Sequence, residues 1–417
     1  MLKKLNSPLV ALWLTVFIDL LGLGIVIPIF AALFFIPGAV FFGLEADLGG
    51  IHLSTSVIYG LLLAAYPFAQ FIASPILGDL SDKYGRKKLL VLSIAGTLSA
   101  YIMTAISVMT GNFWLMIIAR AWDGFTGGNI SVAQSAVADI STPETKAKNF
   151  GLLGMAFGFG FVIGPYIGGK LSDPAVVSWF SFATPFIFSA ILTLINICLI
   201  AFNLTETASL DNSRKINLLG AFSNIQRAIQ LEKVRDILLV TFLFVFGFNF
   251  FTQFFQVYLI EYFSYTQSQI GDLFAYVGIW IALTQGFFLR KLLVRYQPNQ
   301  IARVSLLALS IAFVVLIIPK QAWALWVTIP FIAIFNGLTQ PNLITMTSDL
   351  ADKKTQGEIL GIGQSVQSLA QTIPPLVAGF VNSIHPNLPT LVAAGVIFVS
   401  WLAYLSFLRA QKISWHQ

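Results

Sequence analysis

Residues 8–35 read PLVALWLTVFIDLLGLGIVIPIFAALFF, a nearly continuous apolar run that contains one charged residue, Asp19. The run exceeds the roughly 20 residues that an α-helix needs to cross the hydrocarbon core of a bilayer. Of the 417 residues, 57% are hydrophobic and 10% are charged, whereas soluble domains have about 45–50% apolar and about 25% charged residues. The sequence therefore predicts an all-α membrane protein. The N-terminal run is too long for a cleaved signal peptide, so we interpret it as the first span.

Similar runs recur along the chain and predict twelve transmembrane helices. A more polar linker, residues 203–236, separates an N-terminal six-helix half, residues 1–202, from a C-terminal six-helix half, residues 237–417. Within the linker, an apolar face formed by Leu218, Leu219, Phe222, Ile225 and Ile229 predicts a short amphipathic helix. The expected spans are residues 8–34, 54–78, 89–110, 112–139, 148–170, 180–202, 237–260, 270–289, 301–319, 323–349, 357–381 and 389–408.

The lysines and arginines indicate the orientation of these spans. If the loops alternate between two sides, Lys170 and Lys320 fall on one side and Arg120 lies inside a span. The other 21 of the 24 Lys and Arg residues fall on the opposite side, together with both termini. The positive-inside rule makes that side cytoplasmic. The net charge of +6 therefore sets topology and attracts anionic membrane lipids, and we expect no nucleic-acid partner.

The sequence contains no pattern that is typical of an enzyme or a cofactor site. The three histidines are far apart and Cys198 is the only cysteine, which argues against a metal site and an internal disulfide. The patterns H-E-x-x-H, G-x-S-x-G and G-x-x-x-x-G-K-[ST] do not occur. We therefore expect no enzymatic activity, no cofactor, no metal and no direct coupling to ATP.

Residues 78–88, GDLSDKYGRKK, place six charged residues between the second and third expected spans. Asp82 and Arg86 are four residues apart, so they can pair with each other or with a neighbouring helix. Glycine has no Cβ, so Gly78 and Gly85 permit a tight turn and a close approach of helices. The corresponding loop of the second half, GFFLRKLLVRYQ at residues 286–297, keeps a glycine and the basic residues but lacks the acidic ones. Such a repeated half is typical of secondary transporters.

Several stretches, in one order along the chain, resemble a known family. The loop pattern of Gly78, Leu80, Asp82, Gly85 and Arg86 resembles the signature of the major facilitator superfamily, with Lys83 where arginine is usual. RAWDGFTGGN (120–129) and GFGFVIGPYIGG (158–169) are similar to motifs of its fourth and fifth spans. Three more stretches resemble its tetracycline-resistance-type drug:proton antiporters: DLLGLGIVIP (19–28), ADISTPETKAKNFG (138–151) and GEILGIGQSVQSLAQTIPP (357–375). The resemblance covers essentially the whole chain.

The resemblance implies the major facilitator fold and a cytoplasmic gate. The gate would be a charge network that holds one state of the transporter and breaks when the two halves rock. Its residues would be Gly78, Asp82, Gly85, Arg86 and Asp139. The alternative is a topology anchor at the lipid surface, which a basic loop also provides. We favour the gate for Asp82 and Arg86, because orientation alone requires no acidic residue.

Three charged residues lie deep inside the first and fourth expected spans. A carboxylate within a membrane is costly and therefore indicates function, so Asp19 is the first choice for the proton-coupling site. The alternative is a structural hydrogen bond from Asp19 to another helix. Arg120 and Asp123 are three residues apart and share a helix face. Arg120 either responds to the protonation of Asp19 or Asp123, or simply neutralises Asp123, since buried charges are usually paired.

The second half has neutral polar residues in its spans. We expect amides to line the substrate cavity together with Phe250, Phe254 and Phe255, and the alternative is hydrogen bonding between helices. The amides are Asn249, Gln253, Gln256, Gln285, Asn336, Gln340, Gln364, Gln367 and Gln371. Protons are thus assigned to the first half, and substrate contacts to the second half and the interface. The glycines of the fifth span predict a flexible helix at that interface.

These expectations combine into one function and one alternative. We expect a monomeric, multi-pass protein of the inner (cytoplasmic) membrane that exports a small amphiphilic, drug-like molecule in exchange for protons by rocker-switch alternating access. The alternative is a transporter of the same fold for an endogenous metabolite or siderophore, in either direction. A channel is disfavoured because the two-fold internal repeat favours rocking halves.

Overall fold

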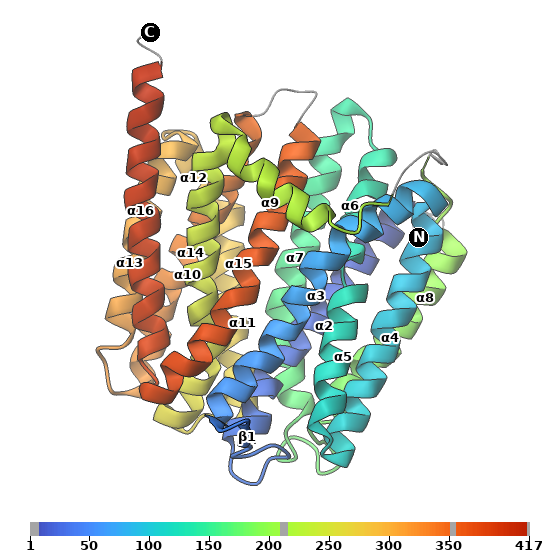
Figure 1. The fold of residues 1–417 in the computed structure, drawn as a ribbon, viewed down its shortest axis with the longest axis vertical. Coiled ribbons are helices and arrows are strands. Elements are labelled where there is room, and N and C mark those ends of the chain that lie inside the picture. Colours follow the sequence, from blue (N-terminus) through green and yellow to red (C-terminus); the bar gives the residue numbers. More distant parts are fainter. Residues whose placement is uncertain (1–7, 209–215, 351–355, 415–417) are drawn as a thin grey trace. The chain divides into compact units, whose positions relative to one another are not determined.

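The computed structural model describes residues 8–208, 216–350 and 356–414, and these are almost entirely helical (Figure 1). The linker residues 209–215 lie outside the described ranges. The first part of the chain comprises α2 (Pro8–Phe35), β1 (Ala46–Leu48), β2 (Ile51–Leu53), α3 (Thr55–Tyr84), α4 (Arg86–Thr110), α5 (Phe113–Thr126), α6 (Asn129–Asp139), α7 (Pro143–Leu171) and α8 (Thr184–Asn203).

The linker contains α9 (Gly220–Gln230), which confirms the predicted short helix, although Leu218 and Leu219 precede its first turn. The rest of the chain comprises α10 (Glu232–Phe263), α11 (Gln267–Leu283), the π-helical η1 (Thr284–Phe288), α12 (Leu289–Leu293), α13 (Pro298–Leu316), the short 3-10 helix η2 (Ala322–Ala324), α14 (Leu325–Asp349), α15 (Gln356–Ile384) and α16 (Leu388–Ser414).

Ten helical segments within the described ranges are long and apolar enough to cross a membrane. The two other expected spans differ for physical reasons. Residues 112–139 form two helices of 14 and 11 residues, α5 and α6, and each is shorter than a bilayer requires. The 29-residue α15 is long enough, but amides such as Gln364, Gln367 and Gln371 make it more polar. The chain is therefore a helical multi-pass membrane protein, and the count of twelve spans stays a prediction.

Local signals explain where several helices begin and end. Gly111 has a φ of +67° and terminates α4, because glycine adopts this left-handed conformation without a steric penalty. Asn112 follows, and its Oδ1 accepts a hydrogen bond from the Leu115 N–H at 3.1 Å, which caps the start of α5. Pro143 stands at the start of α7, where its missing N–H has no cost.

A small hairpin between α2 and α3 was not predicted from the sequence. Gly49 and Gly50 both have positive φ, as a two-residue type I′ turn requires, and they join β1 to β2 with Asp47 opposite His52. Each strand has only three residues, too few for the period-2 pattern to stand out in the sequence.

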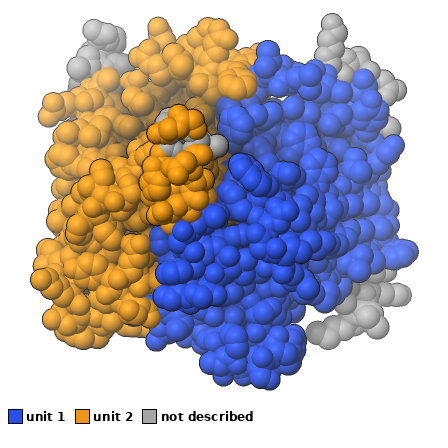
Figure 2. Space-filling view, turned by 60° about the horizontal axis from the view of Figure 1, so that its bottom comes forward, with its two compact units in different colours: residues 1–44, 65–221, 265–278 blue, residues 45–64, 222–264, 279–417 orange. Residues whose placement is uncertain are grey.

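The chain forms two compact units (Figure 2). Unit 1 comprises residues 1–44, 65–221 and 265–278, and unit 2 comprises residues 45–64, 222–264 and 279–417. The start of α3 therefore belongs to the unit formed mainly by the C-terminal helices. The start of α11 belongs to the unit formed mainly by the N-terminal helices. This exchange places functional side chains of α3 and α11 against partners that are distant in sequence.

Each unit has its own apolar core. In unit 1, α2 contributes the fully buried Leu12 and Val16, which cluster with Ile94 of α4 and Val132 of α6. In unit 2, Phe250, Phe254 and Phe255 of α10 are at most 2% exposed. These three aromatic rings are buried in this conformation, and their expected place at a substrate cavity stays a prediction.

Candidate functional site

Asp19 lies in the middle of α2 and accepts hydrogen bonds from two other helices. The Asn129 side-chain N–H₂ of α6 donates to Asp19 Oδ2 at 2.9 Å, and that of Asn196 on α8 donates to Asp19 Oδ1 at 3.4 Å. Asn196 is itself fixed, because its Oδ1 accepts a hydrogen bond from Thr15 Oγ1 at 2.9 Å. Asp19 as a whole residue is half-buried. The site therefore includes the interhelical hydrogen bonds considered above.

Arg120 and Asp123 of α5 neutralise each other. Arg120 Nη1 lies 2.8 Å from Asp123 Oδ2, and both side chains are 8% exposed. The guanidinium carbon of Arg120 also lies 4.6 Å from the ring centroid of Tyr66 and 5.0 Å from that of Phe30. A buried ion pair of this kind has its charges compensated locally. Of the two carboxylates, Asp123 is thus engaged in an ion pair with Arg120, whereas Asp19 is held by the amides of Asn129 and Asn196.

The fourth expected span is interrupted at Gly127 and Gly128, between α5 and α6. Both glycines have ψ near −4°, which departs from regular α-helical geometry. The Gln70 side-chain N–H₂ donates to the Gly127 carbonyl oxygen at 3.1 Å and ties this break to α3. A Cβ at Gly128 would lie 3.2 Å from the Cα of Ser74, so a larger residue would push α3 away. Because of this break, α6 is a separate helix that begins at Asn129.

Arg86 is the centre of the charged cluster that the sequence indicated. Its Nη2 lies 2.6 Å from Asp82 Oδ1, its Nε lies 3.1 Å from Asp139 Oδ2, and its Nη1 donates to Ser81 Oγ. Arg86 is 9% exposed. The structure therefore brings together Asp82, Arg86 and Asp139, from α3, α4 and α6.

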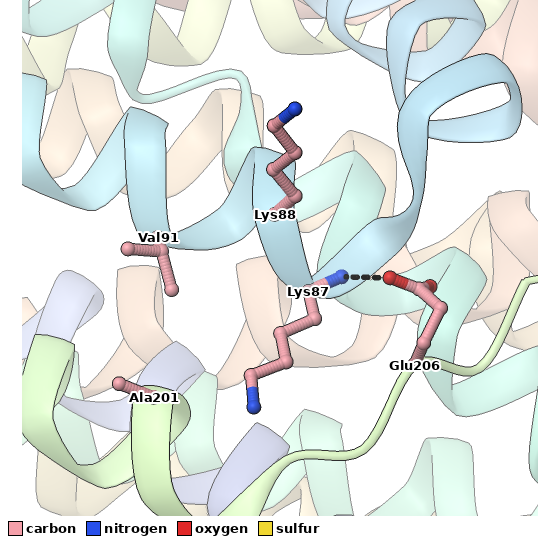
Figure 3. Close-up of a pocket in the computed structure, with 5 residues that line it drawn as sticks. All are labelled: Lys87, Lys88, Val91, Ala201 and Glu206. Carbon is pink, nitrogen blue, oxygen red and sulfur yellow. Dashed lines mark hydrogen bonds between the residues drawn. The ribbon is translucent and has the colours of Figure 1, made fainter.

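Glu206 joins this cluster and was missed from the sequence. Its carboxylate accepts hydrogen bonds from the backbone N–H of Arg86 at 2.7 Å and of Lys87 at 3.2 Å, which stabilises the start of α4. Figure 3 shows Glu206 in a pocket of about 310 Å³ whose other lining residues include Lys87 and Lys88. The only signal in the sequence was an acidic residue shortly after an apolar run.

Gly85 and Gly78 differ in their surroundings. Gly85 has a φ of +102°, a conformation that favours glycine. A Cβ at this position would also overlap the Glu206 carboxylate, which would have to move. A Cβ at Gly78 would meet no described atom within 4 Å. The expectation that Gly78 marks a close approach is therefore not met in this structure.

The glycines of α7 pack mainly against α2. A Cβ at Gly160 would lie 2.7 Å from the Cβ of Leu20, and one at Gly164 would lie 2.8 Å from the Cα of Gly24. Gly168 is packed against the Ile25 backbone. These three glycines therefore join two helices of the N-terminal group, and the expectation of a flexible helix at the interface between halves is wrong for them. Gly169 alone faces α11, where a Cβ would lie 3.1 Å from the Cα of Gly271.

An ion pair accompanies the contact between α7 and α11. Lys170 Nζ lies 2.9 Å from Asp272 Oδ2 and 2.8 Å from Ser268 Oγ. The Gln267 side-chain N–H₂ donates to the Ser172 carbonyl oxygen at 3.2 Å. Because α7 runs from Pro143 to Leu171, this cluster lies at the opposite end of α7 from the loop that follows Asp139.

The start of α3 makes a comparable contact in unit 2. The Asn382 side-chain N–H₂ of α15 donates to Ser56 Oγ at 3.0 Å. The ring of Tyr59 packs edge-on against Phe254, with centroids 5.4 Å apart. A Cβ at Gly60 would overlap the Pro375 carbonyl oxygen, so the two backbones are in close contact.

The amides of the second half differ in exposure. Gln285, Gln340 and Gln364 are exposed, and Gln285 lies in the π-helical segment η1. Asn249 and Gln253 form a hydrogen bond along α10, Gln253 Nε2 to Asn249 Oδ1 at 3.4 Å. Gln367 and Gln371 are half-buried.

Gln256 and Asn336 are only 5% and 8% exposed. In this conformation these two side chains lie in the interior, so they do not line an open cavity.

The comparisons with known proteins agree with this architecture. The model of the Major Facilitator Superfamily matches residues 12–375 and, separately, residues 237–415. The class C tetracycline resistance protein of Escherichia coli is 29% identical over 377 residues, which cover 90% of this chain and 89% of that protein. The quinolone resistance protein NorA of Staphylococcus aureus (strain COL) is 26% identical over 398 residues, which cover 94% of this chain and 94% of that protein.

Solved structures support the fold. The human organic anion transporter MFSD10 has a TM-score of 0.71 at 20% identity and covers 95% of this chain and 98% of its own. A D-xylose-proton symporter has a TM-score of 0.74 at 14% identity and covers 95% of this chain and 97% of its own. These matches concern transport and resistance proteins, not enzymes. From the family match over nearly its whole length, the chain belongs to the major facilitator superfamily.

Proposed function

We propose that the protein is a proton-coupled antiporter that exports a small amphiphilic, drug-like molecule across the inner membrane. Similarity to proteins named for tetracycline and quinolone resistance supports the class of cargo. The observation that carries the proposal is Asp19, a carboxyl group in the middle of an apolar helix that two amides from other helices hold in place. A carboxylate at this depth is expensive to maintain without a function.

Asp19 is the proton-carrying residue in this proposal. Asp123 is less suited to the task, because it is 5% exposed and its charge is already compensated by Arg120. Arg120 and Asp123 instead keep a fixed, neutral pair close to Asp19. Proton release and uptake at Asp19 then change the net charge of this region by one.

The transport cycle in this proposal is rocker-switch alternating access between two clusters of contacts. The Asp82–Arg86–Asp139 cluster acts as the cytoplasmic gate, with Gly85 and Glu206 fixing the start of α4. The Lys170–Asp272 pair and the Ser56–Asn382 hydrogen bond act at the other side. Among these contacts, the partly exposed Lys170–Asp272 pair can break and re-form at low cost.

The exposed amides Gln285, Gln340 and Gln364, with Asn249 and Gln253, are the proposed substrate contacts of the second half. Amides and neighbouring apolar surface suit amphiphilic molecules of several kinds. The protein works as a monomer in this proposal, surrounded by membrane lipid and with both termini in the cytoplasm.

The test measures proton movement in proteoliposomes that contain a trapped pH-sensitive dye. Tetracyclines, cationic dyes and siderophores are added in turn to wild type, Asp19→Asn and Asp173→Asn. Asp173 is a matched control, because it is a half-buried loop carboxylate whose hydrogen bond among the described residues comes from the nearby Ala175 N–H. We expect a substrate-evoked proton signal in wild type and Asp173→Asn, and none in Asp19→Asn.

Two results would change the proposal. A signal that persists in Asp19→Asn would transfer proton coupling to another group, with Asp123 first. A response to siderophores alone, with no response to tetracyclines or dyes, would replace the drug-like cargo by an endogenous metabolite.

A further inference from the structure

The helix α6 touches the two charged sites of unit 1 at its two ends. Its first residue, Asn129, donates to Asp19, and its last residue, Asp139, accepts from Arg86. Eleven residues of α-helix span about 16 Å, so the two contacts are separated by about the length of α6. Both contacts lie within one compact unit.

The surroundings of α6 allow it to move as one body. It is separated from α5 by the Gly127–Gly128 break, and its own side chains Val132, Ala133 and Ala136 are at most 1% exposed. Side chains packed at this density transmit a displacement rather than absorb it. A change at Asn129 therefore reaches Asp139.

Asn129 and Asn196 hold the same carboxyl group in different ways. Asn196 uses both ends of its amide, donating to Asp19 and accepting from Thr15. Asn129 is 2% exposed and donates to Asp19, but its Oδ1 has no hydrogen-bond partner among the described residues. Asn196 is thus anchored by α2 on both sides, whereas the position of Asn129 depends on Asp19.

Protonation of Asp19 changes the hydrogen bond between Asp19 and the Asn129 side chain. A charged carboxylate is a markedly stronger acceptor than a neutral carboxylic acid, so the Asn129–Asp19 hydrogen bond weakens when Asp19 takes up a proton. The protonated carboxyl group also becomes a donor, and the unpartnered Oδ1 of Asn129 is an acceptor on the same side chain. Both effects favour a new position of the Asn129 amide.

The other ionisable groups near Asp19 stay constant in this scheme. Arg120 and Asp123 of α5 form their own ion pair. Tyr66 of α3 and Tyr101 of α4 interact electrostatically with Asp19 and are neutral at physiological pH. Asn129 and Asn196 are the groups that α6 and α8 direct at Asp19.

We infer that Asn129 is a positioning residue through which α6 links the protonation of Asp19 to the Arg86–Asp139 contact. With Asp19 charged, α6 is tied at its start and Asp139 stays on Arg86. With Asp19 neutral, the Asn129–Asp19 hydrogen bond weakens, and the contact between Arg86 and Asp139 weakens with it. The inference rests on the proposed role of Asp19 as a proton carrier and adds how the proton signal reaches the gate.

The experiment measures amide hydrogen exchange of the full-length protein in nanodiscs at a single pH. Asp19→Asn supplies a neutral side chain at constant pH, so no other group changes its protonation. We expect exchange in residues 130–139 to rise about five- to tenfold in Asp19→Asn. Asn129→Ala alone should raise it similarly, and Asp19→Asn should then add no further increase.

Asn196→Ala is the matched control, because it also removes a donor to Asp19 but lies on α8. In Asn196→Ala, exchange in α6 should stay low, and Asp19→Asn should still raise it. Asn129→Ser, which keeps a hydroxyl donor, should recover part of the protection and so distinguishes positioning from general damage to the fold.

The linkage is overturned if Asp19→Asn leaves α6 unchanged, if its effect adds to that of Asn129→Ala, or if Asn196→Ala behaves like Asn129→Ala. The proteoliposome assay reports separately on the proposed function. Loss of the proton signal in Asp19→Asn with unchanged α6 exchange removes the linkage and keeps the antiporter. Altered α6 exchange without any substrate-evoked proton signal keeps the linkage and removes the antiporter.

Discussion

Lys170 Nζ lies 2.9 Å from Asp272 Oδ2, and this ion pair connects the last turn of α7 with α11. The two side chains are 30% and 37% exposed, so solvent screens their attraction and the pair contributes little to stability. A weak, specific ion pair of this kind can break and re-form when the conformation changes.

For the Lys170–Asp272 pair, we predict that Lys170→Met and Asp272→Asn each change the rate of substrate-evoked proton movement by about two- to fivefold, because an exposed pair is worth at most about 1 kcal/mol. The thermal transition should shift by no more than a few degrees. The reversed pair, Lys170→Asp with Asp272→Lys, should recover most of the rate. A reversed pair as impaired as the single variants would contradict a role for the attraction itself.

For the cytoplasmic cluster, Asp82→Asn should lower turnover by about tenfold or more, the scale of losing a hydrogen bond to a charged group. Membrane insertion and folding should be largely preserved, because Arg86 keeps Asp139 and Ser81 as partners. Lys88→Gln serves as the control, since it removes a charge from the first turn of α4 that takes no part in the ion pairs of Arg86 with Asp82 and Asp139. Normal turnover in Asp82→Asn would refute the gate.

For Gly85, substitution by alanine should lower the unfolding temperature markedly, because a φ of +102° costs a non-glycine residue about 1–3 kcal/mol. The added methyl would also displace the Glu206 carboxylate from the start of α4. Differential scanning fluorimetry of Gly85→Ala, Glu206→Ala and the double variant separates the two causes. The double variant should remain destabilised, and a wild-type melting temperature in it would show that the clash alone mattered.

For the buried pair in α5, Arg120→Gln should destabilise the protein more than the double variant Arg120→Gln with Asp123→Asn. The single change leaves the buried Asp123 carboxylate uncompensated, a loss of about 3–5 kcal/mol, whereas two neutral partners avoid that penalty. Denaturant midpoints in detergent give the comparison. Equal midpoints for the single and double variants would mean that Asp123 has another compensating group.

Many features of the fold follow from local sequence patterns. The apolar run of α2 is a membrane span by length alone, and the linker helix α9 follows from its amphipathic pattern. The break at Gly127–Gly128 was not foreseen, because two glycines in a span are compatible with a continuous helix. What decides it is the close approach of α3 at Gly128, a tertiary contact that local propensity does not contain.

The candidate site was only partly predictable for the same reason. Asp19, Arg120 and Asp123 are conspicuous because charges are rare in spans. Other members of the site were hidden because they are distant in sequence from the residues they contact: Asn196 lies 177 residues from Asp19, and Glu206 lies 120 residues from Arg86. The pairing of Lys170 with Asp272 was not predicted, because it depends on the structure placing α11 beside α7.

The exchange of residues 45–64 and 265–278 between the two units affects any attempt to divide this protein. A fragment that ends in the linker would leave Gly169 and Lys170 without Gly271 and Asp272. A fragment that begins there would leave Asn382 and Pro375 without Ser56 and Gly60. Each fragment would expose the surface that packs against the missing fragment in the intact protein. The two pieces of the gene should therefore yield well-folded protein only when they are expressed together.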